Sequence, residues 1–152
     1  MIHSCYIKCI APKTTAQTTR RYTKAGGVYT DKKGQGVKDS WVGLLAPHAP
    51  DEPFCNPFDL RIIFTWPWRA SETKKAKATK WLPMSTKPDL DNLAKTVLDS
   101  MVTCGYMTRD QLVWKLMLVK GLGDIPGVGI VMNDELEDDQ IVHHMRKAKG
   151  NV

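Results

Sequence analysis

The sequence predicts a single small α+β domain with one mixed β-sheet and about two helices. The chain has 152 residues, 42% of them hydrophobic, which suits one domain with a real core. Its apolar segments follow strand or helix periods in the order strand, loop, helix, strand, helix, strand, strand. We expect residues 1–133 to form this domain and residues 134–152 to be a charged, flexible tail. No apolar run approaches the roughly 20 residues of a membrane helix, and the start carries no secretory pattern. We therefore expect no membrane partner and a cytoplasmic location.

The first third of the chain combines one strand with a long basic segment. Residues 2–10 are predicted to form a strand that ends at Ala11-Pro12. Residues 13–38 hold seven Lys and Arg residues against a single acidic residue. Glycines interrupt this basic segment on both sides of a β-prone triplet, which predicts a hairpin or a long loop on the surface. Residues 37–45 are long enough for a short helix.

Prolines and lysines mark the middle of the chain. Four prolines exclude regular structure from residue 46 to residue 57. Residues 58–66 are rich in β-branched and aromatic side chains and predict a strand, which Pro67 ends. Residues 69–87 form a basic connector in which Glu72 is the only acidic residue.

The clearest helix spans residues 89–105. Asp89 is a good N-cap residue, and the apolar side chains that follow it recur at helical spacing. Residues 111–120 predict a strand with both faces largely covered. Residues 121–127 predict a turn, and residues 128–132 predict the last strand.

The four cysteines are predicted to be free thiols. Their spacing gives no CxxC pair and no zinc-ribbon pattern. In a reducing compartment such cysteines are most simply buried or partly buried thiols. They are Cys5, Cys9, Cys55 and Cys104.

The net charge of +6 is unevenly distributed along the chain. Residues 1–100 hold 16 Lys and Arg against 9 Asp and Glu, whereas residues 101–152 hold 6 against 7. This imbalance suggests one cationic face, which attracts polyanions such as DNA by releasing their counterions. The alternative is an ordinary surface with surplus lysine. The candidate DNA-binding residues are Arg20, Arg21, Lys32, Lys33, Lys74, Lys75, Lys77 and Lys87.

The segment from Lys87 to Lys95 carries the residues of chemical interest. Asp89 lies at the helix N-cap and Asp91 in the first turn, where the helix dipole and unpaired amides favour negative charge. One carboxylate at this place is structural by default, but two exceed what a cap requires. Asp91, Lys95 and Asp99 are spaced by four residues, so they share one face of the helix, largely away from its apolar stripe.

A third carboxylate, Asp110, opens the next predicted strand. If that strand returns beside the helix, Asp110 comes close to Asp89 and Asp91, and the three form an all-oxygen site suited to Mg²⁺ or Mn²⁺. Such sites hydrolyse phosphodiesters. Lys95 is then placed to hold the phosphate or to stabilise charge in the transition state. The alternative is purely structural: an N-cap, an ion pair between residues four apart, and an unrelated Asp110.

The helix start resembles a known family motif. The segment Asp89-Leu90-Asp91-Asn92-Leu93-Ala94-Lys95 is similar to the Asp-x-Asp-Asn-x-x-Lys motif of the RusA family of Holliday junction resolvases, common in phages and prophages. Asp99, Gly105 and Asp110 follow in the order and approximate spacing of that family. The resemblance covers residues 2–132. Its specific part is residues 87–113.

Two positions depart from the family pattern. Arg109 stands where many members have a second acid, and Leu112 stands where a polar residue is usual. The first departure bears on the neighbouring position and not on Asp110 itself.

The resemblance implies a RusA-like fold and an Mg²⁺-dependent endonuclease, with Mn²⁺ as an alternative ion, that resolves four-way junctions by paired phosphodiester hydrolysis. It implies that Asp89, Asp91 and Asp110 bind the metal and that Lys95 joins them in catalysis. It also implies an intertwined homodimer with branched DNA as its partner. Symmetry supports the dimer independently, because a junction needs two opposed nicks and a two-fold dimer supplies two identical sites.

Two other functions stay open on the sequence alone. One is a non-catalytic DNA-binding protein that uses the same basic face. The aspartates argue against it, because carboxylates repel phosphate unless a cation lies between them. The other is an Mg²⁺-dependent nuclease for flaps, forks or RNA, which the sequence does not exclude.

Overall fold

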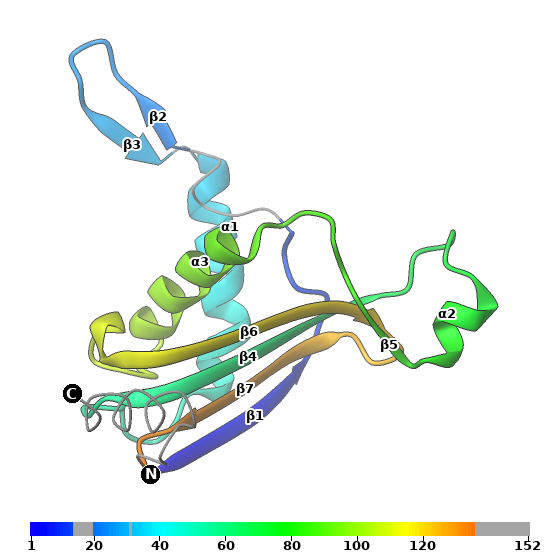
Figure 1. The fold of residues 1–152 in the computed structure, drawn as a ribbon. Coiled ribbons are helices and arrows are strands. Elements are labelled where there is room, and N and C mark those ends of the chain that lie inside the picture. Colours follow the sequence, from blue (N-terminus) through cyan, green and yellow to red (C-terminus); the bar gives the residue numbers. More distant parts are fainter. Residues whose placement is uncertain (14–19, 31, 136–152) are drawn as a thin grey trace, which may run out of the picture.

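The computed structural model describes residues 1–13, 20–30 and 32–135, and its centre is a five-stranded mixed β-sheet (Figure 1). The strands lie in the order β1-β7-β4-β6-β5. Their bounds are Ile2–Lys8 for β1, Phe58–Pro67 for β4, Trp81–Pro83 for β5, Val113–Gly123 for β6 and Gly127–Asn133 for β7. β4 and β6 are parallel, and the other neighbouring pairs are antiparallel. The predicted α+β class with one mixed sheet is therefore confirmed.

Two long helices, α1 (Lys32–Leu45) and α3 (Leu90–Thr103), pack on the same face of the sheet (Figure 1). Trp41 of α1 and Val97 of α3 are fully buried in the core. Trp41 meets the ring of Phe64 on β4 edge to face, with 6.0 Å between the ring centroids. No helix within the described ranges is long and apolar enough to span a membrane.

The helix α1 begins earlier than the expected range of residues 37–45. Gly34 and Gly36 oppose a helix locally, because each costs about 1 kcal/mol relative to alanine. Trp41 and Leu45 are completely buried, and burying a large apolar side chain contributes about 1.5–3 kcal/mol. This burial anchors the C-terminal part of the helix. Local hydrogen bonds support its early turns, because the Gln35 side-chain amide donates to the Asp39 carboxylate at 3.0 Å and the Ser40 hydroxyl donates to the Gly36 carbonyl at 2.8 Å.

Short elements fill the segments that the pattern predicts as irregular. The hairpin expected within the basic segment is present, formed by β2 (Arg20–Tyr22) and β3 (Val28–Thr30). The basic connector is not one loop, because α2 (Lys74–Ala78) and β5 lie within it. Thr73 starts α2 by accepting a hydrogen bond from the Ala76 amide at 3.1 Å. The described residues thus hold three α-helices instead of about two, with the short 3-10 helices η2 (Ala46–His48) and η3 (Asp110–Leu112) beside them.

Gly121 and Gly123 lie inside β6, and the turn expected from residue 121 to residue 127 is confined to residues 124–126. The indole of Trp81 on β5 packs directly on this bare backbone. A Cβ added at Gly121 would lie 2.3 Å from two ring atoms of Trp81. The glycines therefore serve the close approach of a neighbouring strand and not a turn.

Both ends of the described domain meet in the sheet. β1 pairs with β7 along its whole length, from Ile2 opposite Asn133 to Lys8 opposite Gly127. The amino group of Met1 binds the carboxylate of Asp134. The tail predicted for residues 134–152 lies outside the described residues beyond Glu135.

The four cysteines are free thiols, as predicted. Burial raises the pKa of the thiols of Cys5, Cys9 and Cys104 above its ordinary value. Cys55 is exposed. Reagents that attack the thiolate should therefore reach Cys55 most readily.

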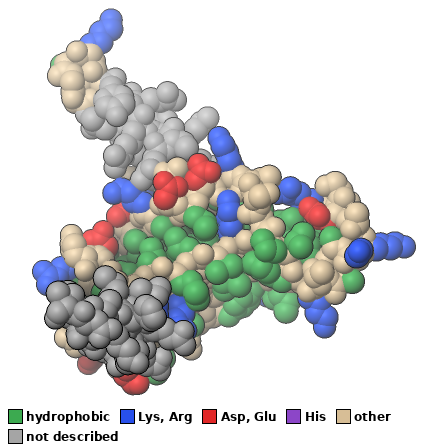
Figure 2. All heavy atoms as spheres, in the orientation of Figure 1, with side chains coloured by type: hydrophobic (Ala, Val, Ile, Leu, Met, Phe, Trp, Pro, Cys, Tyr) green, Lys and Arg blue, Asp and Glu red, His purple; other side chains and the backbone are tan. Residues whose placement is uncertain are grey.

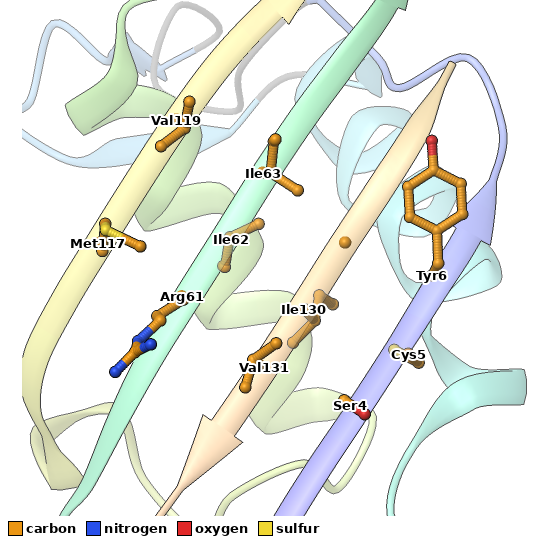
Figure 3. A pocket seen from close by; sticks show the side chains of 11 residues that line it. Ser4, Cys5, Tyr6, Arg61, Ile62, Ile63, Met117, Val119, Ile130 and Val131 are labelled. Atoms are coloured by element: carbon orange, nitrogen blue, oxygen red, sulfur yellow. The ribbon is translucent and has the colours of Figure 1, made fainter. Parts of the chain in front are cut away.

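The sheet face turned away from α1 and α3 carries exposed apolar side chains (Figure 2). A shallow hollow of about 560 Å³ follows it across β1, β7, β4 and β6 (Figure 3). Its lining includes Tyr6, Arg61, Ile63, Met117, Gly129 and Val131. At Gly129 the side chains of the neighbouring strands close over the bare backbone, because an added Cβ would lie 2.7 Å from a methyl carbon of Ile63 and 3.5 Å from a ring carbon of Tyr6.

Candidate functional site

The start of α3 presents two exposed carboxylates. Asp89 is the N-cap residue, with extended backbone angles (φ −70°, ψ 139°), and Asp91 lies in the first turn. The carbonyl of Asp89 accepts the first helical hydrogen bond, from Leu93 at 3.0 Å, but its side chain makes no capping hydrogen bond. The predicted N-cap position is therefore correct, while the carboxylate stays available for another partner. The unpaired amides of this turn favour anions, including a phosphate.

The two faces of α3 have different roles, as the spacing predicts. Leu93, Val97 and Met101 are fully buried against the sheet. Lys95 is exposed one turn beyond Asp91. The ion pairs within the described residues include none between Lys95 and its neighbours four residues away. The structural alternative of an ion pair on this face is thus not realised, and the Lys95 ammonium is open to a ligand.

Asp91 lies in the first turn of α3, whereas Asp110 lies in η3, which leads directly into β6. Figure 1 shows that β6 begins beside the C-terminal end of α3. The helix has 14 residues, which corresponds to about 21 Å at 1.5 Å per residue. The connection after it is held in place, because the amide of Phe54 donates to Tyr106 at 2.9 Å and the amide of Thr108 donates to Phe54 at 3.1 Å. One chain therefore does not bring Asp110 to the helix start. In the described part of a single chain, no three His, Cys, Asp or Glu residues form a group that could hold a metal ion.

The strand β6 does return to the start of α3, but it brings Lys120 and not Asp110. The Lys120 ammonium donates to the backbone carbonyls of Thr86 and Pro88, both at 2.7 Å. The amide of Met84 donates to the Lys120 carbonyl at 3.1 Å, and the Arg69 guanidinium donates to the Thr86 hydroxyl. Lys120 thus fastens the segment that leads into Asp89.

Sequence reasoning missed Lys120. The available signal was weak: it is one of two lysines in the otherwise apolar run of residues 112–122. Its partners are backbone carbonyls more than thirty residues away in sequence, and side-chain patterns do not reveal such contacts.

Basic segments project on two sides of the α3 start. The hairpin of β2 and β3 extends from one side of the molecule and α2 from another (Figure 1). Lys74, Lys75 and Lys87 are exposed, and Lys77 is half-buried. Figure 2 shows acidic side chains near the start of α3 with Lys and Arg side chains on both sides. Arg20, Arg21, Lys32 and Lys33 belong to β2 and the first turn of α1, but their side chains lie outside what the structure describes.

The apolar hollow on the other sheet face is not part of this site. Its lining residues include no Asp, Glu or His. It therefore offers no carboxylate or imidazole to bind Mg²⁺ or to act as a general base, and its apolar lining does not suit a polyanion.

The fold and the site together fit a nuclease, with paired carboxylates and a lysine at a helix start among basic segments. The family model described as "Endodeoxyribonuclease RusA" matches residues 11–133. This match covers well over half of the 152 residues, and the chain belongs to the RusA family of endodeoxyribonucleases. It is therefore a hydrolase of DNA phosphodiester bonds. No curated protein matches the chain significantly.

Proposed function

We propose that this chain is an Mg²⁺-dependent endonuclease that resolves four-way DNA junctions by paired phosphodiester hydrolysis. The observation that carries the proposal is the pair of exposed carboxylates, Asp89 and Asp91, at the start of α3 in a RusA-family chain. The Asp89 side chain makes no capping hydrogen bond, so its carboxylate is available to a cation. Proteins commonly bind Mg²⁺ through one or two carboxylates, while phosphate oxygens and water complete the coordination shell. Mn²⁺ suits the same oxygen ligands.

Each residue of the helix start has a distinct role in this proposal. Asp89 and Asp91 hold the metal, and a bound Mg²⁺ would supply an activated water and charge neutralisation at the scissile phosphate. Lys95, exposed one turn further along, contacts a phosphate oxygen and stabilises the charge that develops there. Lys120 acts indirectly, because it fixes the backbone immediately before Asp89.

A homodimer completes the site in this proposal. Asp110 is exposed at the far end of α3, so its carboxylate reaches a metal at Asp89 and Asp91 only from a second chain. A two-fold dimer then contains two equivalent sites, which matches the two opposed nicks that junction resolution requires. Such a site is inactive in the monomer, which protects duplex DNA from single cuts.

The basic segments on either side of the helix start supply DNA affinity, mainly through phosphates. In this proposal the enzyme acts on branched DNA in the cytoplasm. A purely DNA-binding role is the second candidate, but exposed carboxylates in the middle of a basic surface would weaken such binding unless a cation lies between them and the phosphates.

Purified protein incubated with labelled substrates should cut a four-way junction in Mg²⁺ and leave it intact in EDTA. The panel should include a fork, a flap, a linear duplex and a hairpin RNA, each with Mg²⁺, with Mn²⁺ and with EDTA. Preferential cutting of the fork, flap or RNA would overturn the junction specificity. Junction binding without any cutting in either metal would favour the DNA-binding role.

Replacing Lys74, Lys75 and Lys77 together by Gln should lower junction affinity and flatten its salt dependence. Each lost phosphate contact reduces the log–log slope by up to about 0.9. The measurement is the dissociation constant of the EDTA-treated complex at several salt concentrations. The matched control replaces the same lysines by Arg, which keeps the charge and should keep the slope. An unchanged slope in the Gln variant would move the binding surface to Arg20, Arg21, Lys32 and Lys33.

A further inference from the structure

A small pocket, the Trp81 pocket, lies at the end of the sheet where the parallel strands β4 and β6 finish. Its volume is about 240 Å³. The residues that line it lie on or next to β4, β5 and the turn between β6 and β7, and they are Thr65, Lys80, Trp81, Gly123, Asp124 and Ile125. Pockets for drug-sized ligands measure about 300–1,000 Å³. The Trp81 pocket therefore suits a smaller group, such as a single planar heterocycle.

The indole ring of Trp81 is fixed in place from two sides. Its Nε1 donates a hydrogen bond to the Thr65 hydroxyl at 3.2 Å. A Cβ added at Gly121 would lie 2.3 Å from two ring atoms, and a Cβ added at Gly123 would lie 3.2 Å from a third. The two glycines thus give the ring its position on the sheet, yet Trp81 is only half-buried and lines the pocket. Proteins stack nucleobases on aromatic rings that are held in this way.

The backbone of Lys80 is strained where it enters the pocket. Its φ of 65° lies in the left-handed region, which residues other than glycine seldom adopt. Its amide donates to the Lys77 carbonyl, and its own carbonyl accepts from the Asp124 amide, both at 3.1 Å. Strain of this kind is concentrated at ligand sites. Here it leads the chain from the basic helix α2 directly into β5, so the two elements are in contact at this end of the sheet (Figure 1).

The charges around the pocket suit a base inside it and phosphates outside it. The lysines of α2 and the exposed Lys80 lie beside the pocket, where they can contact a DNA backbone. Inside, the Asp124 carboxylate accepts from Trp68 Nε1 at 2.7 Å through one oxygen. The ion pairs found in the described ranges do not include Asp124. A carboxylate repels a phosphate, but it accepts a hydrogen bond from the exocyclic amino group of a base.

We propose that the Trp81 pocket binds one unpaired base of the DNA substrate, which stacks on the Trp81 ring and donates its amino group to Asp124. The inference rests on the proposed function, because it takes branched DNA as the substrate. A base that is already unpaired costs less to extrude than a base within a duplex. An intact duplex offers no such base, so the pocket favours branched DNA. Cytosine, adenine and guanine carry the amino group, whereas thymine does not.

Photochemical cross-linking tests where the unpaired base lies. The probe is a four-way junction with one unpaired 5-iodocytosine at the crossover, bound to the unmodified protein in EDTA and irradiated. Mass spectrometry of the digested complex should place the cross-link on Trp81, because this photoreaction joins the base to an aromatic ring stacked on it. A cross-link confined to other aromatic residues would overturn the proposal.

Binding measurements test the energetic contribution of the pocket. Trp81→Leu should weaken binding of this junction in EDTA at least fivefold, because the stacking of one base is lost, and should leave binding of a linear duplex unchanged. Trp81→Phe retains a ring and should restore most of the affinity. The matched control is Ile10→Ala, which removes an exposed apolar side chain outside the pocket and should change neither affinity.

The base preference tests the role of Asp124. Unpaired thymine in place of cytosine should lower the affinity of the wild-type protein, and Asp124→Leu, which cannot accept a hydrogen bond, should remove that difference. Equal losses on junction and duplex in both Trp81 variants would overturn the pocket. Mg²⁺-dependent junction cutting by a protein that forms no cross-link at Trp81 would remove the pocket and leave the proposed function standing. The cross-link in a protein that cuts no junction would do the reverse.

Discussion

Asp91→Asn is expected to abolish junction cleavage while leaving junction binding intact or slightly tighter. The side chain is exposed in the first turn of α3, so its replacement removes little packing. The amide keeps the shape of the carboxylate but is a much weaker ligand for a hard cation. Loss of an outer partner of a metal site costs about 10–100-fold in affinity or activity, and loss of a direct ligand should exceed that range. The measurements are single-turnover cleavage in Mg²⁺ and junction binding in EDTA.

Asp99→Asn is the matched control for this variant. Asp99 lies two turns further along the same face of α3, and the proposed metal site does not use it. It should cut at close to the wild-type rate. An Asp91→Asn protein with a normal thermal midpoint that loses binding and cutting in equal proportion would instead show that Asp91 positions DNA.

Mixing two inactive variants is expected to restore cutting if Asp110 acts across the dimer. Asp91→Asn and Asp110→Asn should each be inactive alone. In a mixed dimer, one site contains both substitutions and the other contains neither. With random exchange about half of the dimers are mixed, so about a quarter of the wild-type sites return. The two variants are unfolded and refolded together, and nicking of a single junction strand is then measured. Paired cutting of two strands should stay low, because a mixed dimer contains only one intact site.

The control for the mixing experiment combines Asp89→Asn with Asp91→Asn. Both of these residues come from the same α3 start, so no mixed dimer contains an intact site. This mixture should stay inactive. Wild-type chains mixed with either variant show whether subunits exchange. If they exchange and the Asp91→Asn and Asp110→Asn mixture still stays inactive, Asp110 does not complete the site from a second chain.

Local patterns predicted the elements that depend on local chemistry. The helix at residues 89–105 was predicted with its N-cap at Asp89, because capping preference and apolar spacing agree there. The strand at residues 58–66 was likewise within one residue of β4. Both elements bury their apolar side chains in the same core, so local preference and packing favour the same structure.

Features that depend on distant contacts could not be predicted in this way. Gly121 lies in a strand because the Trp81 ring packs on it, and no turn pattern can distinguish that role from a bend. The placement of Asp110 depends on the direction in which β6 returns along α3. In each case the structure at the residue is determined by a contact with a segment that is remote in sequence. A wrong assumption about which segment lies there gives a wrong secondary structure or a wrong position for the residue.

The pairing of β1 with β7 affects how the chain reaches its folded state during synthesis. β1 leaves the ribosome before the other strands of the sheet, yet within the described residues its sheet partner is β7, the strand that is made last. Contacts of such long sequence separation form slowly, because the intervening chain must first be ordered. The remaining strands and both long helices can assemble while β1 is still unpaired. The ion pair between the Met1 amino group and Asp134 forms only when β1 joins the sheet. A domain fused to the N-terminus should therefore slow the pairing of β1 with β7, which is the last step of folding. An insertion in the turn at residues 124–126 should slow the same pairing, because that turn leads into β7.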